Sequence, residues 1–141
     1  MKTIIALKGK GGSGKTTTIN ILYELLVQNS YIKQMGNCKG KGDFTAILQK
    51  KNKLIGITSV GDNYDIVYQR LKDFVDLKCE VCVCACRTFD RKGHGTIAAI
   101  NEFPSYQHIF INKTFDRNAA TQTSTNIDDA REIFNEIEKQ I

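Results

Sequence analysis

The chain has 141 residues, of which 41% are hydrophobic and 25% charged, and its net charge is +5. This length allows one domain, and the composition is typical of a globular chain with a buried core, which excludes a disordered polymer. The apolar runs are shorter than the roughly 20 residues of a membrane-spanning helix, and the short N-terminal run leads directly into a glycine-rich loop. We therefore expect a cytoplasmic protein with no signal peptide and no membrane contact.

Strands and helices are predicted to alternate along the chain. An apolar, β-branched run indicates a buried strand at 3–7, and apolar residues at helical spacing indicate a helix from Lys15 to about Gln28. Residues 29–42 show no periodicity. The remaining predicted elements are two strands joined as an antiparallel hairpin, a helix, a buried strand, a short helix, a strand and a final helix, at 43–49, 54–60, 64–75, 80–86, 96–103, 108–112 and 127–141.

This order of elements predicts the architecture. Strands that alternate with helices indicate an α/β fold of three layers with a mainly parallel sheet, in which the hairpin strand can be antiparallel at one edge. The whole chain, residues 1–141, is expected to form this single domain. We expect Asn126 to cap the final helix, with Asp129 three residues later completing a cap-like start.

A complete phosphate-binding motif lies between the first strand and the first helix. Residues 9–16, Gly-Lys-Gly-Gly-Ser-Gly-Lys-Thr, match G-x-x-x-x-G-K-T. Its glycines allow positive φ angles and bring backbone N–H groups close to phosphate oxygens, and the following helix adds the positive end of its dipole. Lys15 is expected to reach the β- and γ-phosphates, and Thr16 to bind Mg²⁺. The predicted nucleotide-binding residues here are Gly9, Lys10, Gly11, Gly12, Ser13, Gly14, Lys15, Thr16 and Thr17.

Within this P-loop, residues 9–18 resemble the deviant Walker A loop of the partition, septum-site and nitrogenase-iron-protein ATPases. In that family a second lysine, which matches Lys10, reaches across a dimer to the partner's nucleotide. The resemblance covers about the first 28 residues, and no Asp-Pro-containing motif follows the second strand. It implies a homodimeric ATPase switch that binds protein or DNA partners, and the alternative is that Lys10 faces solvent in its own loop.

The order of elements is similar to that of the small nucleoside-monophosphate and metabolite kinases. In those enzymes lid arginines close over the transferring phosphoryl group, and Arg87 and Arg91 occupy the matching place after the strand at 80–86. Arginine suits this role because its planar fork binds phosphate oxygens bidentately. The alternative is a surface loop in which the two arginines pair with Asp90 or with solvent.

The residues after the last strand bear on the nucleotide base. Asn112-Lys113 is similar to the start of the guanine-binding N-K-x-D motif of Ras-like GTPases, but the motif's aspartate position holds Phe115 and the acid follows at Asp116. We therefore expect ATP rather than GTP, with Asn112 and Lys113 bordering the base.

A carboxylate is expected to complete the magnesium site at the end of the strand beside the P-loop strand. Asp62 follows the strand at 54–60, which makes it the candidate catalytic and Mg²⁺-binding acid, and Ser59 could contact the same water shell. The alternative is that Asp62 caps the helix that begins near Asn63.

Four of the five cysteines crowd into one short segment, as Cys79, Cys82, Cys84 and Cys86. The last three alternate with apolar residues, so in a strand they share one face at intervals of about 6.6 Å. A straight strand cannot bring three such thiolates around one tetrahedral ion. The pattern therefore predicts free thiols packed in the core rather than a metal site.

The net charge is concentrated between Lys33 and Lys53, where six lysines accompany Asp43 alone. Such a segment can attract nucleic acid, although a solvated loop and hairpin turn is the favoured interpretation.

These patterns together predict an enzyme that transfers a phosphoryl group from ATP with Mg²⁺, most simply a small kinase for a nucleotide or related metabolite. They do not identify the phosphoryl acceptor. The dimeric ATPase switch is the first alternative, and a nucleotide-binding module without turnover is the second.

Overall fold

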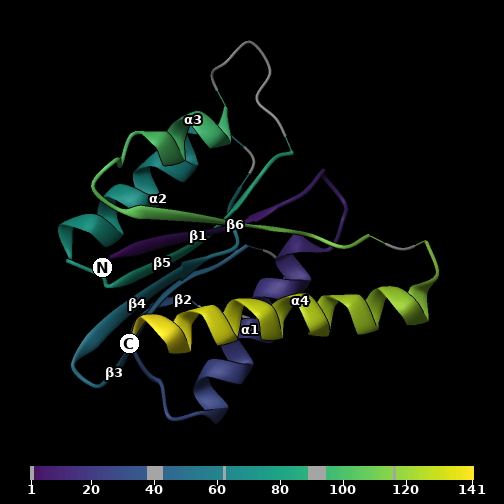
Figure 1. Ribbon diagram of the computed structural model, residues 1–141, viewed down its shortest axis with the longest axis horizontal. Coiled ribbons are helices and arrows are strands. Elements are labelled where there is room, and N and C mark those ends of the chain that lie inside the picture. Colours follow the sequence, from purple (N-terminus) through teal and green to yellow (C-terminus); the bar gives the residue numbers. More distant parts are fainter. Residues whose placement is uncertain (1, 38–42, 62, 89–94, 116) are drawn as a thin grey trace.

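The computed structural model of the chain describes residues 2–37, 43–61, 63–88, 95–115 and 117–141. These residues form six strands and four helices (Figure 1). In chain order they are β1 (Thr3–Lys8), α1 (Lys15–Gln28), β2 (Ile32–Asn37), β3 (Thr45–Lys50), β4 (Lys53–Thr58), α2 (Tyr64–Asp76), β5 (Val81–Cys86), α3 (Thr96–Asn101), β6 (Gln107–Asn112) and α4 (Ala119–Gln140).

The six strands form one mixed sheet in the order β2-β3-β4-β5-β1-β6. β1 lies between β5 and β6 and is parallel to both, and β4 is parallel to β5. β3 is antiparallel to both β2 and β4. The antiparallel strand therefore lies one place inside the edge, because β2 adds a further strand beyond the predicted hairpin.

Helices cover both faces of the sheet, as Figure 1 shows: α2 and α3 lie on one side, and α1 and α4 on the other. Each face has its own buried cluster, and β5 contributes to both because its side chains alternate. Val81, Val83 and Ala85 pack with α1 and α4, whereas Cys82, Cys84 and Cys86 pack with α2 and α3. The arrangement is an α/β fold compatible with three layers.

The cysteines are part of this core, as predicted. Cys79, Cys82, Cys84 and Cys86 form no disulfide among the described residues, and each is 0% exposed. Burial raises the pKa of Cys79 to about 11 and holds the pKa of Cys82 and Cys84 well above the usual value. The described part of the chain contains no group of three or more His, Cys, Asp or Glu residues arranged to hold a metal ion.

This burial predicts that the four thiols are unreactive in the folded protein. In a Cys38→Ser variant, a chromogenic disulfide reagent at pH 8 should modify none of them, and after unfolding in guanidinium it should modify all four. Unfolded thiols ionise near pH 8.5, so the unfolded state loses these protons first and the free energy of unfolding should fall as pH rises above about 9. Rapid labelling of the native variant would contradict the core packing.

The β3–β4 hairpin has the tightest connection in the fold. Lys51 and Asn52 form its two-residue turn with φ angles of 54° and 63°, and Lys50 pairs with Lys53 across the strand ends. Two consecutive positive φ angles are typical of a type I′ turn, whose twist matches that of the strands. The antiparallel hairpin predicted around these lysines is confirmed.

β2 was not predicted, and its irregular pairing and its exposed apolar side chains explain why. It is an edge strand with a register shift between Lys33 and Met35, which corresponds to a bulge at Gln34. Ile32 is 66% exposed and Met35 is 54% exposed. A bulged strand with exposed apolar side chains has no alternating pattern, so periodicity does not reveal it.

The predicted start of the final helix is wrong. α4 begins at Ala119, and the side chain of Asn118 accepts hydrogen bonds from the backbone N–H groups of Ala120 (3.0 Å) and Thr121 (3.2 Å). Asn126 is therefore inside the helix, where it is only 6% exposed. The first two turns of α4 have no apolar face: most of their side chains are exposed, and the Gln122 amide donates to the Ser13 carbonyl of the P-loop at 3.4 Å. Among the described helices, none combines the length and apolar character needed to cross a membrane.

Candidate phosphate-binding site

The P-loop joins the carboxyl end of β1 to the N-terminus of α1. Gly12 and Gly14 have φ angles of +74° and +94°, which side chains rarely adopt. The backbone carbonyl of Lys10 accepts hydrogen bonds from the Ser13 backbone N–H (3.3 Å) and hydroxyl (2.7 Å), which close the turn. Gly14 is the N-cap of α1, and no described side chain caps this helix end. The positive end of the helix dipole is therefore available to a ligand.

A cavity of about 490 Å³ opens above this loop, and we call it the phosphate cavity. It is lined by residues 11–17 together with Asp43, Ser59, Gly61 and Arg87. Its volume is within the range of small-molecule sites. The structure thus brings seven of the nine predicted loop residues to one cavity. Gly9 lies beneath it, where a Cβ atom would come within 2.9 Å of the Lys113 Cβ and the Ser13 Oγ.

The ammonium group of Lys15 lies across the loop. It donates hydrogen bonds to the backbone carbonyls of Gly9 and Lys10, the latter at 2.9 Å, and its side chain lines the phosphate cavity. The lysine is therefore held on the concave side of the loop, next to the N-terminus of α1.

Asp43 is a site residue that sequence reasoning missed. The Thr16 hydroxyl donates to its Oδ1 at 3.0 Å, and the Ser59 hydroxyl donates to the same oxygen at 3.1 Å. The predicted strand at 43–49 included Asp43, but β3 begins at Thr45 and leaves the acid in front of the P-loop. The sequence offers one signal that could have identified Asp43, because it is the single acid between Lys33 and Lys53.

The predicted acid, Asp62, lies outside the described residues. The premise that its strand is next to the P-loop strand is wrong, because β5 lies between β4 and β1. Gly61, which precedes it, does line the phosphate cavity. The N-cap of α2 is Asn63, whose side chain accepts from the Ile66 backbone N–H at 3.0 Å.

Arg87 lies directly on the P-loop. Its guanidinium group occupies the space next to the Gly11 Cα, so a methyl group there would overlap it. Its backbone N–H donates to the Thr96 hydroxyl at 2.8 Å, which fixes the chain where it leaves β5. The structure therefore places Arg87 in the phosphate cavity, whereas Arg91 lies outside the described residues.

The P-loop rests on α4. Asn126 accepts hydrogen bonds through Oδ1 from the Gln122 amide (2.6 Å) and the Thr18 hydroxyl (3.3 Å). A Cβ on Gly14 would approach the same oxygen to 2.8 Å. Asn126, expected as a helix cap, thus supports the loop from below.

Lys113 and Asp129 form a buried ion pair. The Lys113 ammonium donates to Asp129 Oδ2 at 2.9 Å and to the Thr114 carbonyl at 2.6 Å, and its side chain is 0% exposed. The Thr114 backbone N–H donates to Asp129 at 2.8 Å. Asp129 therefore anchors the β6–α4 loop rather than completing a helix cap. Contact of Lys113 and the exposed Asn112 with a base stays a prediction.

Lys10 lies at the rim of the loop. Its ammonium is 4.6 Å from the centroid of the Phe115 ring in the same chain, and both residues are exposed. This cation–π contact leaves both interpretations of Lys10 open.

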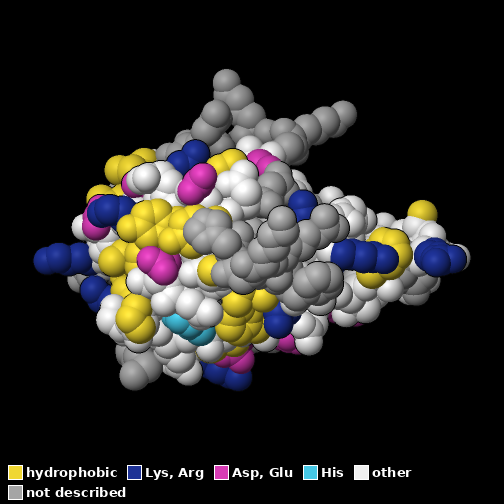
Figure 2. Space-filling model, turned by 90° about the horizontal axis from the view of Figure 1, so that it is seen from above, with side chains coloured by type: hydrophobic (Ala, Val, Ile, Leu, Met, Phe, Trp, Pro, Cys, Tyr) yellow, Lys and Arg dark blue, Asp and Glu magenta, His cyan; other side chains and the backbone are white. Residues whose placement is uncertain are grey.

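The lysine-rich segment is partly described. Lys50 packs on the Tyr31 ring at 4.7 Å and lies 3.8 Å from Glu138. On the face of the molecule in Figure 2, Lys and Arg side chains are spread singly among other residues rather than gathered in a patch. Binding of nucleic acid stays a prediction that is not favoured.

Comparison with protein-family models, with curated proteins and with solved structures gave no match for this chain. The functional assignment therefore depends on the chemistry of the phosphate cavity.

Proposed function

We propose that this chain is an ATP-binding P-loop NTPase that transfers the γ-phosphoryl group of ATP to a small acceptor. The observation that carries the proposal is the phosphate cavity, where backbone residues 11–17, the N-terminus of α1 and the Arg87 guanidinium gather around one space. Backbone N–H groups, a helix dipole and an arginine fork together favour a polyphosphate. Lys15 adds a point charge on the concave side of the loop.

The oxygen atoms near Thr16 are of the kind that bind magnesium. Two hydroxyls, of Thr16 and Ser59, lie within 3.1 Å of the Asp43 carboxylate, and Mg²⁺ prefers such oxygen ligands. In the proposed complex Thr16 binds the ion and Asp43 supplies negative charge beside it. When bound there, the ion would supply positive charge that neutralises charge developing during transfer. The preference for ATP over GTP depends on Phe115, which occupies the position of the guanine-binding aspartate.

Substitution of Lys15 tests the proposal. Lys15→Ala should weaken binding of ATP with Mg²⁺ by at least about tenfold, or about 1.4 kcal/mol, because the charge next to the phosphates is lost. Isothermal titration calorimetry measures this directly, with Lys139→Ala on the exposed end of α4 as the matched control. A folded Lys15→Ala protein that binds ATP as tightly as the wild type would overturn the phosphate-site assignment.

A further inference from the structure

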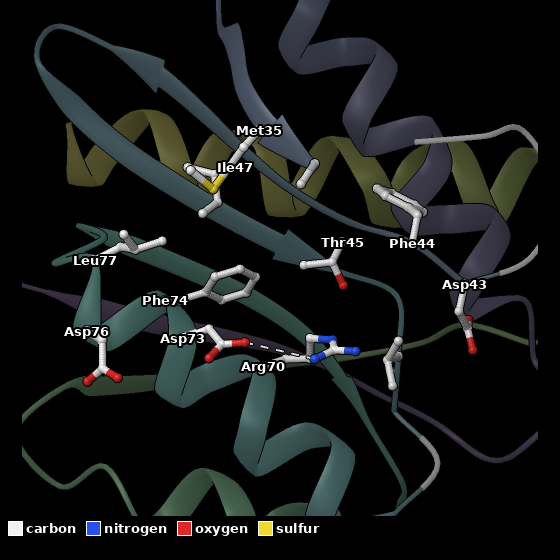
Figure 3. A pocket seen from close by; sticks show the side chains of 12 residues that line it. Met35, Asp43, Phe44, Thr45, Ile47, Arg70, Asp73, Phe74, Asp76 and Leu77 are labelled. Carbon is white, nitrogen blue, oxygen red and sulfur yellow. Dashed lines mark ion pairs between the residues drawn. The ribbon is translucent and has the colours of Figure 1, made fainter. Parts of the chain in front are cut away.

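A second cavity, of about 630 Å³, lies beside the phosphate cavity, and we call it the α2 pocket (Figure 3). It is formed between α2 and the ribbon of β2 and β3. Asp43 lines both cavities. The segment that follows β4 separates them: Ser59 and Gly61 line the phosphate cavity, and Val60 lines the α2 pocket. A molecule in the α2 pocket would therefore lie next to a nucleotide in the phosphate cavity.

The α2 pocket is apolar at its centre. Figure 3 shows Phe74 of α2 and Leu77, which follows this helix, on one side and Met35 and Ile47 of the β2–β3 ribbon on the other. Phe74 and Ile47 are 1% and 6% exposed, so they form a floor that belongs to the core. Met35 and Leu77 are 54% and 42% exposed, so they form open walls.

The bulge in β2 is what brings Met35 to this pocket. Lys33 pairs with Leu48, and the next pair is Met35 with Ile47, so Gln34 is the extra residue. Without the bulge, Gln34 would stand opposite Ile47, and Met35 would turn to the α1 and α4 face. The irregular strand thus places an apolar, adaptable side chain over the pocket.

Charges at the rim indicate what the pocket accepts. Its lining contains Arg70 and three aspartates, Asp43, Asp73 and Asp76. Arg70 lies 3.9 Å from Asp73, and Asp76 pairs with Lys72 at 3.0 Å. Among the described lining residues the one arginine is shared with an aspartate, so these residues together carry no excess of positive charge. A nucleoside monophosphate would bring a dianion towards these carboxylates, which is unfavourable.

We infer that the α2 pocket binds the phosphoryl acceptor, and that this acceptor is an uncharged molecule with an apolar or aromatic body and a hydroxyl group. The inference rests on the proposed function. In the transfer, the acceptor oxygen bonds to the γ-phosphorus while the bond from that phosphorus to the β–γ bridging oxygen breaks. ADP leaves with the bridging oxygen, and the hydroxyl proton passes to solvent. The apolar body stays between α2 and the β2–β3 ribbon.

Binding without nucleotide tests the inference separately from the proposed function. The probes are two pairs that share a body but differ in charge: 2-phenylethanol with phenylacetate, and thymidine with thymidine 5′-monophosphate. Saturation-transfer NMR on the full chain should show at least one neutral member binding at low millimolar concentration and its anionic counterpart at least about tenfold more weakly. Binding of ATP, measured on the same sample by calorimetry, reports on the phosphate cavity alone.

Exposed residues supply matched variants. Met35→Glu and Leu77→Glu place a charge in the pocket, whereas Ile32→Glu on β2 and Ile66→Glu on α2 change other exposed apolar side chains that do not line it. Only the first two should weaken binding of the neutral probe, by about tenfold. The inference is wrong if no probe binds at 10 mM, if the anions bind as well as the neutral compounds, or if all four variants behave alike. It is also wrong if the wild type dimerises and Met35→Glu makes it monomeric. If a probe binds but ATP does not, the proposed function fails instead.

Discussion

Replacement of Arg87 by alanine should lower the turnover of ATP by about a hundredfold while the dissociation constant of ATP changes only a few-fold. The guanidinium lies on the P-loop at Gly11, where the γ-phosphoryl group would be transferred. Its fork stabilises charge that develops in the transition state more than charge in bound ATP, so kcat should respond more than binding. Formation of ADP at saturating ATP measures kcat, and calorimetry measures binding.

Three further variants make this result decisive. Arg131→Ala removes an exposed arginine from α4 and should leave both quantities unchanged. Lys10→Ala separates phosphoryl transfer from the dimeric ATPase switch, which requires this lysine and a rate that rises with protein concentration. If Arg87→Ala retains the full rate and Lys10→Ala loses it, the switch should replace the proposed kinase. The double variant with Arg91→Ala, the other predicted lid arginine, should be at least as impaired as Arg87→Ala.

Loss of the Asp129 carboxylate should have the largest effect on stability. The buried Lys113 ammonium has two described acceptors, and Asp129→Ala removes the carboxylate and leaves only the Thr114 carbonyl. Removing one partner of a buried ion pair costs about 3–5 kcal/mol. The substitution also removes the acceptor of the Thr114 backbone N–H. The free energy of unfolding should fall by this amount, and the Tm by about 10 °C or more. Urea unfolding and calorimetry measure the two quantities.

Glu132→Ala, an exposed change on the same helix, is the control and should alter stability by less than about 0.5 kcal/mol. The pair Lys113→Met with Asp129→Leu removes both charges and should recover most of the lost stability, since apolar replacements of buried pairs are often tolerated. An Asp129→Ala protein with wild-type stability would show that the ion pair is not an anchor.

The elements predicted correctly are those whose information is local. The segment at 80–86 indicated a buried strand, which the structure has as Val81–Cys86, and the short spacing between two strand-like segments indicated the hairpin that turns at Lys51-Asn52. The boundary of a helix was predicted wrongly where its side chains show no apolar periodicity. The start of α4 is the example, because its first turns face the P-loop through Gln122 and Asn126.

The residues of the candidate site also divide into those that local sequence predicts and those that only the fold brings together. The loop at 9–17 is one continuous segment, so it could be predicted from the sequence alone, and its binding of phosphate stays a prediction. Asp43 reaches Thr16 from 27 residues away, and Asn126 reaches Thr18 from 108 residues away. No spacing rule connects such residues, because their contact depends on where the sheet and α4 place them. Arg87 was predicted only because the order of elements led to the end of β5.

The bulge at Gln34 has one more consequence, which concerns solubility. A straight edge strand offers a continuous row of unpaired N–H and C=O groups on which another chain can extend the sheet. β2 forms one edge of this sheet, and its exposed side chains include Ile32 and Met35. The bulge interrupts that row, and Lys33 beside it carries a charge that a second strand would have to accommodate. The irregularity that shapes the α2 pocket therefore also discourages edge-to-edge aggregation.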